Sequence, residues 1–198
     1  MNNLLKKPIV DPIPIRYLCD ISYDTRNKKI FIMSNEKFFC MEDYRDNVAS
    51  ALGFNITDTV VFDDDSATLI EFKSGKYENI STTQLKDQFI GSKKFFDYTK
   101  KYNLKEYYCV VVINVFVYGL KEKINYLKNK SLKKKGSREL VFLEERISEV
   151  NNDIRNNGMN PIRVMKSVDF IKKYDIHLCD YDDTCSKKPR KVKCKLKN

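Results

Sequence analysis

The run from Tyr107 to Tyr118 is the feature that most limits what this chain can fold into. It spans 12 residues that are apolar or aromatic except for Asn114. A helix that crosses a bilayer needs about 20 such residues, so the run is too short for that role. A strand that is apolar on both sides fits a sheet whose two faces are covered by helices. We therefore expect an α/β protein, with a strand from about 106 to 118 inside the sheet.

Two shorter β-rich runs precede this strand. Residues 59–62 and 67–73 are rich in β-branched and aromatic side chains, and the polar residues 63–66 between them favour a turn, which predicts a β-hairpin. The fold class that we predict is α/β, with a central mixed sheet flanked by helices. Apolar periodicity, caps and breakers predict the other elements, a strand at 29–33 and helices at 36–52, 82–102, 140–152 and 168–174.

A length of 198 residues fits one domain with appendages. Pro8, Pro12 and Pro14 favour an extended start, because proline lacks a backbone N–H and biases its predecessor away from helix. The parts that we expect are an N-terminal extended segment and strand (1–35), a core (36–120), a basic loop (121–138), a helical C-terminal part (139–178) and a basic tail (179–198).

The net charge of +10 is concentrated in two segments. Residues 121–138 hold eight basic side chains and one acid, and residues 187–197 hold seven basic side chains and no acid, so the rest of the chain is mildly acidic. Such segments favour a polyanionic partner, with nucleic acid first, although a solvated loop and tail remain an alternative. The residues expected to bind phosphates are Lys128, Lys130, Lys133, Lys134, Lys135, Arg138, Lys187, Lys188, Arg190 and Lys191.

The hairpin brings three charged residues to one face. If the turn is centred on residues 64 and 65, Asp58 lies opposite Glu71; if the register shifts by two, it lies opposite Lys73. Side chains alternate along a strand, so Asp58, Glu71 and Lys73 share a face in either register. Neighbouring carboxylates repel each other unless a cation lies between them. Lysine helps, and Mg²⁺, which prefers hard oxygen ligands, helps more. Phosphodiester hydrolysis requires such an arrangement.

These residues resemble the PD-(D/E)xK nuclease superfamily. The likeness consists of Asp58, a twelve-residue gap, the triplet Glu71-Phe72-Lys73 after an apolar strand, and Gln84 opening the next helix. It covers roughly residues 36 to 118 and implies a restriction-endonuclease-like αβββαβ core. The departure from the family pattern is that Ile56 and Thr57, not proline, precede the aspartate.

The resemblance implies a Mg²⁺-dependent (or Mn²⁺-dependent) deoxyribonuclease, with DNA a more expected substrate than RNA and a homodimer a further expectation. Asp58, Glu71 and the carbonyl of Phe72 would bind the metal, and Lys73 would act on the attacking water. Gln84 would support the site, with Gln88 a weaker candidate. Some members of the family add a glutamate from the preceding helix, which is Glu42 here.

Other interpretations of the same residues remain open. Asp58, Glu71 and Lys73 can be surface charges that form a salt bridge on a solvated sheet face. The same fold can also serve as a non-catalytic nucleic-acid-binding or protein-interaction module, or as a subunit that acts only with a partner.

The histidine and the cysteines do not predict a metal site. His177, Cys179, Cys185 and Cys194 have spacings that match no compact zinc finger. Cys19, Cys40 and Cys109 lie in apolar surroundings and are expected to be small core residues. The N-terminal residues lack the apolar stretch of a signal peptide. We therefore expect an intracellular protein, cytoplasmic or nucleoid-associated and not secreted, with reduced thiols.

Overall fold

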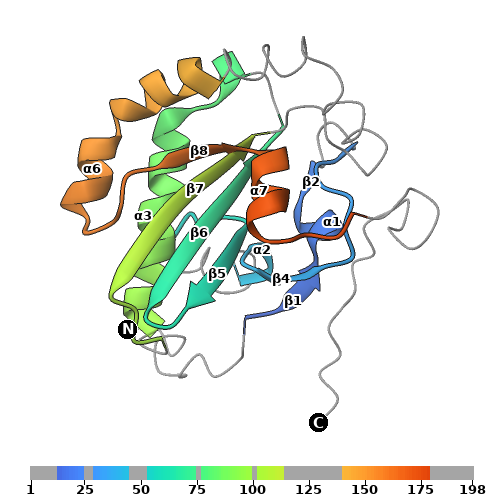
Figure 1. Cartoon of the computed structure of the whole chain (residues 1–198). Coiled ribbons are helices and arrows are strands. Elements are labelled where there is room, and N and C mark those ends of the chain that lie inside the picture. Colours follow the sequence, from blue (N-terminus) through green and yellow to red (C-terminus); the bar gives the residue numbers. More distant parts are fainter. Residues whose placement is uncertain are drawn as a thin grey trace.

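A six-stranded mixed sheet forms the centre of the protein (Figure 1). The computed structural model describes residues 13–24, 29–44, 53–74, 77–99, 102–113 and 140–178. In spatial order the strands are β1 (Ile15–Tyr17), β4 (Lys37–Cys40), β5 (Thr59–Asp63), β6 (Ser66–Lys73), β7 (Glu106–Ile113) and β8 (Arg163–Lys166). A separate ribbon pairs β2 (Tyr23–Asp24) with β3 (Lys29–Ile30), and the short α1 (Leu18–Ile21) follows β1.

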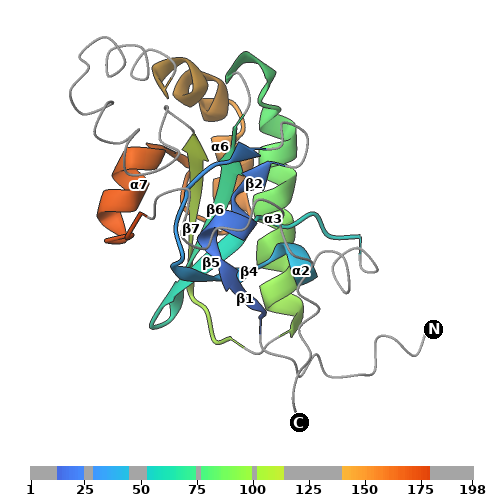
Figure 2. The same ribbon diagram turned by 90° about the vertical axis from the view of Figure 1, so that its right-hand side faces the viewer.

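Helices cover the two faces of the sheet, which confirms the predicted α/β class. Figure 2 views the sheet close to edge-on, with α3 (Thr82–Thr99) on one side and α7 (Ser167–Lys173) on the other. The 3-10 helix η3 (Tyr77–Asn79) leads into α3. The α6 helix (Asn151–Asn156) also lies on the α3 side, where Lys86 of α3 forms an ion pair of 2.9 Å with Asp153.

The predicted hairpin is confirmed, and of the two registers left open by the sequence the structure has the one centred on residues 64 and 65. β5 and β6 pair antiparallel from Thr59 opposite Ile70 to Asp63 opposite Ser66, which leaves a two-residue turn at residues 64–65. Asp64 has φ +46°, a left-handed conformation that Asp tolerates in tight turns. Continuing this register by one residue places Asp58 opposite Glu71.

The strands that follow are parallel. α3 carries the chain back so that β7 pairs parallel with β6, and β8 pairs parallel with β7. β7 is buried along most of its length, as its apolar sequence predicts. The carboxyl ends of these three strands therefore meet at one edge of the sheet, which we call the carboxyl edge. The predicted strand residues 114–118 lie outside the described part of the chain.

The helix predicted at 36–52 is wrong at its start, where residues 37–40 form β4 between β1 and β5. The two adjacent phenylalanines explain the error. Phe38 packs against Phe170 of α7 and Phe39 packs against Phe62 on the α3 side, which is strand alternation and not a helical face. Of the remaining residues only α2 (Glu42–Tyr44) is described, and it is helical. Residues 45–52 lie outside the described ranges.

The C-terminal part agrees with the prediction except for one strand. Residues 140–148 are helical, and α7 matches the helix expected at 168–174. β8 was not predicted, because four residues after Pro161 carry too short a pattern. The strand predicted at 29–33 ends at Ile30, after which Phe31 and Ile32 enter the core.

Cys19, Cys40 and Cys109 are buried, as expected. In the part of the chain that is described, no helix has the length and apolarity needed to cross a bilayer. The basic segments 121–138 and 187–197, with all the lysines and arginines expected to bind phosphates, lie outside the described residues, as do Cys179, Cys185 and Cys194.

Candidate active site

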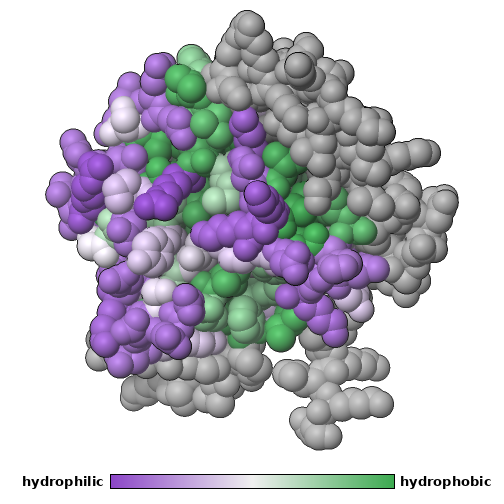
Figure 3. All heavy atoms as spheres, in the orientation of Figure 1, coloured by the Kyte–Doolittle hydropathy of each residue, from purple (hydrophilic) through white to green (hydrophobic). Residues whose placement is uncertain are grey.

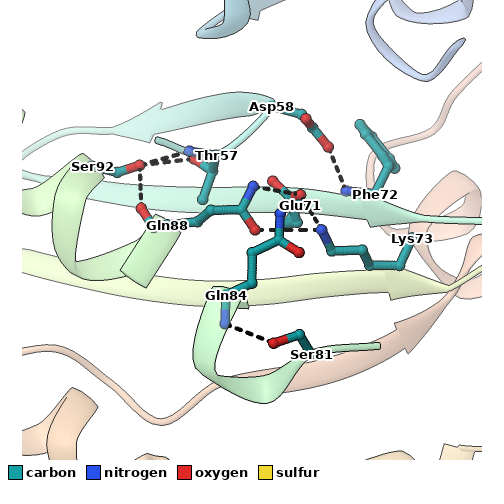
Figure 4. A network of polar contacts seen from close by, with 9 residues as sticks. All are labelled: Thr57, Asp58, Glu71, Phe72, Lys73, Ser81, Gln84, Gln88 and Ser92. Atoms are coloured by element: carbon teal, nitrogen blue, oxygen red, sulfur yellow. Dashed lines mark hydrogen bonds and ion pairs between the residues drawn. The ribbon is translucent and has the colours of Figure 1, made fainter. Parts of the chain in front are cut away.

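Four residues from three segments meet at the open end of the hairpin, beside the carboxyl edge of the sheet (Figure 4). Asp58 directly precedes β5, Glu71 and Lys73 lie near the end of β6, and Gln88 belongs to α3. The hairpin register and the alternation of side chains place the three charged residues on the face that α3 covers. The structure therefore brings together the three charged residues that the sequence singled out.

Glu71 is the centre of this group. It is only 3% exposed. Its Oε1 accepts hydrogen bonds from Lys73 Nζ at 2.7 Å and from Gln88 Nε2 at 2.8 Å. Its Oε2 is buried and has no hydrogen-bond partner among the described residues. Buried carboxylate oxygens are normally paired, so this unpaired oxygen needs a physical explanation.

Lys73 is oriented by two acceptors. Its ammonium forms the ion pair with Glu71 Oε1 and lies 3.4 Å from Gln88 Oε1, while its side chain is 19% exposed. Glu71, Lys73 and Gln88 thus form a closed triangle that holds the ammonium at the margin between protein and solvent. The alternative of a salt bridge on a solvated face does not fit, because Glu71 is buried.

Asp58 is held by the strand on which Glu71 lies. Its Oδ2 accepts the backbone N–H of Phe72 at 2.7 Å, and its own carbonyl accepts the N–H of Met41 at 2.9 Å. In an extended strand the N–H and the C=O of one residue point to the same side. The carbonyl of Phe72 therefore also points toward Asp58. The ring of Phe72 lies on the other face, against Phe31 and Phe170.

Negative charge is crowded at Asp58. Burial raises the pKa of the Asp58 carboxyl well above its ordinary value, and the nearby charge of Glu71 raises this pKa further. The N–H of Phe72 and the ammonium of Lys73 act in the opposite direction, and Glu42 adds a further, smaller increase. Asp58 and Glu71 thus lie close together, with Lys73 beside them. Such an arrangement favours an additional cation.

Of the two glutamines predicted for the site, the structure favours the one given less weight. Gln84 lies in the first turn of α3, is exposed, and donates its backbone N–H to Ser81 Oγ at 3.2 Å. Its side chain extends toward the site in Figure 4. Gln88, one turn later, is 6% exposed and contacts both Glu71 and Lys73. Spacing alone does not distinguish the two, since residues four apart share one face of a helix.

A second polar cluster, which sequence reasoning missed, supports the first. Ser92 Oγ accepts the backbone N–H of Thr57 at 2.9 Å, lies 3.1 Å from Thr57 Oγ1 and donates to the carbonyl of Gln88 at 2.9 Å. Both residues are buried. The residue before Asp58 is thereby tied to the helix turn that carries Gln88. The available signal was the pair of small residues Gly91 and Ser92 one turn after Gln88 on an otherwise bulky helix.

The donor set fits a hard divalent cation with incomplete protein coordination. Glu71 Oε2 is an unpaired buried oxygen, Asp58 lies beside it, and the Phe72 carbonyl points to the same side. Mg²⁺ keeps several water ligands and is held by one or two carboxylates. No group of three or more His, Cys, Asp or Glu side chains with the geometry to hold a metal ion occurs among the described residues. A two-carboxylate site does not require one.

Comparison of the chain with protein-family models, with curated proteins and with solved structures finds no match in any of the three. Arguments about its function therefore rest on the geometry of the site.

Proposed function

We propose that the chain is a metal-dependent nuclease of the PD-(D/E)xK type that hydrolyses phosphodiester bonds, with DNA as the preferred substrate and Mg²⁺ or Mn²⁺ as the cofactor. The observation that carries this proposal is the buried carboxylate of Glu71. One of its oxygens is fixed by Lys73 and Gln88, and the other is left without a partner beside Asp58. Leaving a buried carboxylate oxygen unpaired costs free energy, and binding a cation removes that cost.

In this proposal Asp58, Glu71 and the Phe72 carbonyl hold the metal. A bound divalent ion neutralises charge on the phosphate and lowers the pKa of a coordinated water. Lys73 positions the attacking water and stabilises the negative charge that develops on the phosphate oxygens. Gln88 keeps the Lys73 ammonium in place, because it accepts from Lys73 while donating to the acid that pairs with it. Gln84 and Glu42, at the margin of the site, are candidates to orient substrate or solvent.

The fold supports the same proposal at a coarser level. The antiparallel strands β4, β5 and β6 are followed by α3 and the parallel strand β7, which is the strand and helix order of a restriction-endonuclease-like core. Among the described residues, the four-residue α1 is the helix that precedes β4, and α2 lies between β4 and β5. We therefore base the functional proposal on the site and use the fold as support.

A cleavage assay tests the proposal directly. Purified protein is incubated with linear duplex, supercoiled plasmid, single-stranded and branched DNA and with RNA, in Mg²⁺, in Mn²⁺ and in EDTA. We expect DNA cleavage that requires the metal and is lost in Glu71→Gln. Copurifying nuclease is excluded because the variant is prepared in parallel. DNA binding without cleavage under all these conditions favours the non-catalytic module on the same fold.

A further inference from the structure

The carboxyl edge of the sheet carries a second lysine in line with Lys73. Lys73 of β6 pairs with Ile113 of β7, and Ile113 pairs with Lys166 of β8. The three residues therefore form one row across three parallel strands. Residues of one row point to the same face of a sheet, so Lys166 belongs to the face on which Lys73 lies.

The residues that line a surface hollow show which side chains of β8 point to the α7 side of the sheet and which to the α3 side. A hollow of about 290 Å³ on the α7 side is lined by Thr68 of β6, Tyr108 of β7, and Arg163 and Met165 of β8, among others. Figure 3 shows this side of the molecule, where hydrophilic side chains lie beside apolar surface. Because side chains alternate along a strand, Lys166 lies on the opposite side, with Glu71 and Lys73.

The spacing of the row suits an extended polyanion. Neighbouring strands are about 4.8 Å apart, so the Cα atoms of Lys73 and Lys166 are separated by roughly 10 Å. One DNA strand carries a charge every 3.4 Å along the helix axis, but the strand winds around that axis. Successive phosphates are therefore further apart than 3.4 Å, and the separation of the two lysines corresponds to fewer than three nucleotides. Ile113 between them is fully buried and offers no charge of its own.

The acidic residues of the site repel a phosphodiester, and a nearby cation would reduce that repulsion. The charges of Glu71 and Glu42 both act against the ionised form of Asp58, and among the charged side chains that affect its pKa Lys73 is the cation. A phosphodiester that approaches such a site is repelled unless cations flank its path. Lys166 is the lysine that the described sheet adds to the same row, half-buried at the point where β8 ends and α7 begins.

We propose that Lys166 is a phosphate-binding residue of this site. The DNA backbone then runs along the carboxyl edge of β6, β7 and β8 on the α3 side, with the scissile phosphate at Lys73 and a nearby phosphate of the same strand at Lys166. This inference rests on the proposed function and adds the path of the substrate. The contact positions DNA without reading its sequence.

The test compares two cations on the same strand but on opposite faces. Lys166→Ala and Lys166→Gln are compared with Arg163→Ala, and Lys166→Arg serves as the rescue. Binding of a fluorescein-labelled duplex in EDTA is measured by anisotropy from low to moderate salt, and kcat and KM are measured in Mg²⁺. Circular dichroism checks that each variant is folded.

We expect the Lys166 variants to weaken binding about 5- to 10-fold and to lower the slope of log K against log salt by about 0.9, the value for one phosphate contact. In Lys166→Ala and Lys166→Gln, KM rises with little change in kcat. Lys166→Arg restores the affinity and the KM, and the affinity of Arg163→Ala stays within about twofold of the wild-type value. The inference is overturned if Lys166→Ala and Lys166→Gln bind with unchanged affinity and salt slope, or if Arg163→Ala weakens binding as much. In those cases metal-dependent cleavage by the wild type leaves the proposed nuclease standing. A wild type that neither binds nor cleaves DNA refutes both.

Discussion

The two ends of the β5–β6 hairpin both carry clustered acidic residues, in opposite physical states. At the turn, Asp63, Asp64 and Asp65 form the most conspicuous acidic run of the chain. Asp65 there pairs with Lys105 at 2.7 Å, and both side chains are about half exposed or more. At the open end, Glu71 is 3% exposed and has one oxygen with no partner.

The burial of a carboxylate, and not the number of acidic residues in a segment, distinguishes a candidate site from a solvated turn. Water solvates the carboxylates of the turn, and an exposed ion pair of this kind contributes at most about 1 kcal/mol. Water is excluded from Glu71, so its neighbours Lys73 and Gln88 must compensate the charge. The open end thus holds a buried carboxylate oxygen without a partner among the described residues, and the turn end shows no such atom. Metal binding is the explanation that the experiments below test.

The largest effect is expected from removing the ammonium at the open end. Lys73→Ala should lower the rate of DNA cleavage at least about 1,000-fold, because it removes the group that stabilises developing charge, while duplex binding changes little. Lys105→Ala, which removes a lysine paired to an acid at the turn end, is the matched control and should cleave normally. Gel-based cleavage rates and anisotropy measure the two properties. Retained cleavage by Lys73→Ala contradicts the assignment of this lysine.

Next in size is a packing effect at the open end. A Cβ at Gly91 of α3 would lie 1.8 Å from the carbonyl oxygen of Asn55, in the segment that leads to Asp58. Gly91→Ala should therefore lower the free energy of unfolding by about 3 kcal/mol, although helix propensity alone predicts a gain of about 1 kcal/mol. The sign of the change, measured by urea denaturation, separates the two causes.

Gly158→Ala is the control for this substitution. Gly158 has φ +70°, and a Cβ there meets only the side chain of Lys93 at 3.8 Å. Gly158→Ala should lower the free energy of unfolding by about 1 kcal/mol, from backbone strain alone. An increase in stability for Gly91→Ala would show that α3 does not approach Asn55 this closely.

The third prediction compares the two glutamines of α3. Gln88→Ala should reduce cleavage about 10- to 100-fold, the size of effect seen when a group that orients a metal ligand is removed, because Glu71 and Lys73 both lose a partner. Gln84→Ala should change the rate less, since Gln84 is exposed at the rim. Restored activity in Gln88→Glu would argue for hydrogen-bond acceptance from Lys73 as its main role. A larger loss for Gln84→Ala than for Gln88→Ala reverses this assignment.

The sequence predicted the hairpin and the shared face of Asp58, Glu71 and Lys73, because strand alternation gives that face in either of the two registers it allowed. The structure then selects the register with a two-residue turn. The sequence did not distinguish Gln88 from Gln84. That choice depends on how α3 sits against β6, which is a matter of tertiary packing.

The elements that the sequence missed are short or ambiguous. The sequence favours a helix at β4 because Phe38 shares a helical face with Met41 and with apolar residues further along, and only the pairing with β1 and β5 shows that residues 37–40 form a strand. β8, with four residues, gains its stability from β7. Lys166 enters the argument only through that pairing, so no local pattern could have identified it.

The smallest effect expected is a gain in stability from neutralising Asp58. In EDTA, Asp58→Asn should raise the free energy of unfolding by about 1 kcal/mol, as is common when a residue held in place for function is replaced. The amide oxygen can still accept the N–H of Phe72, while the repulsion from Glu71 and the cost of burying the charge disappear. Because the pKa of Asp58 is raised in the folded protein, the cost of its charge grows as the pH rises above the carboxyl's unfolded pKa. The gain should therefore be larger at pH 8 than at pH 5.

Asp65→Asn at the turn end is the matched control for this last substitution. It removes a carboxylate that is exposed and paired with Lys105, whose hydrogen bond lowers the pKa of Asp65. Asp65→Asn should therefore lower stability only slightly, because solvent screens an exposed ion pair. The changes in the free energy of unfolding are measured by urea denaturation in EDTA. A gain for Asp58→Asn and a loss for Asp65→Asn would show that the charge at the open end lowers stability, whereas the charge at the turn does not. A loss at both ends would mean that Asp58 is a structural residue, and the argument from its burial would fail.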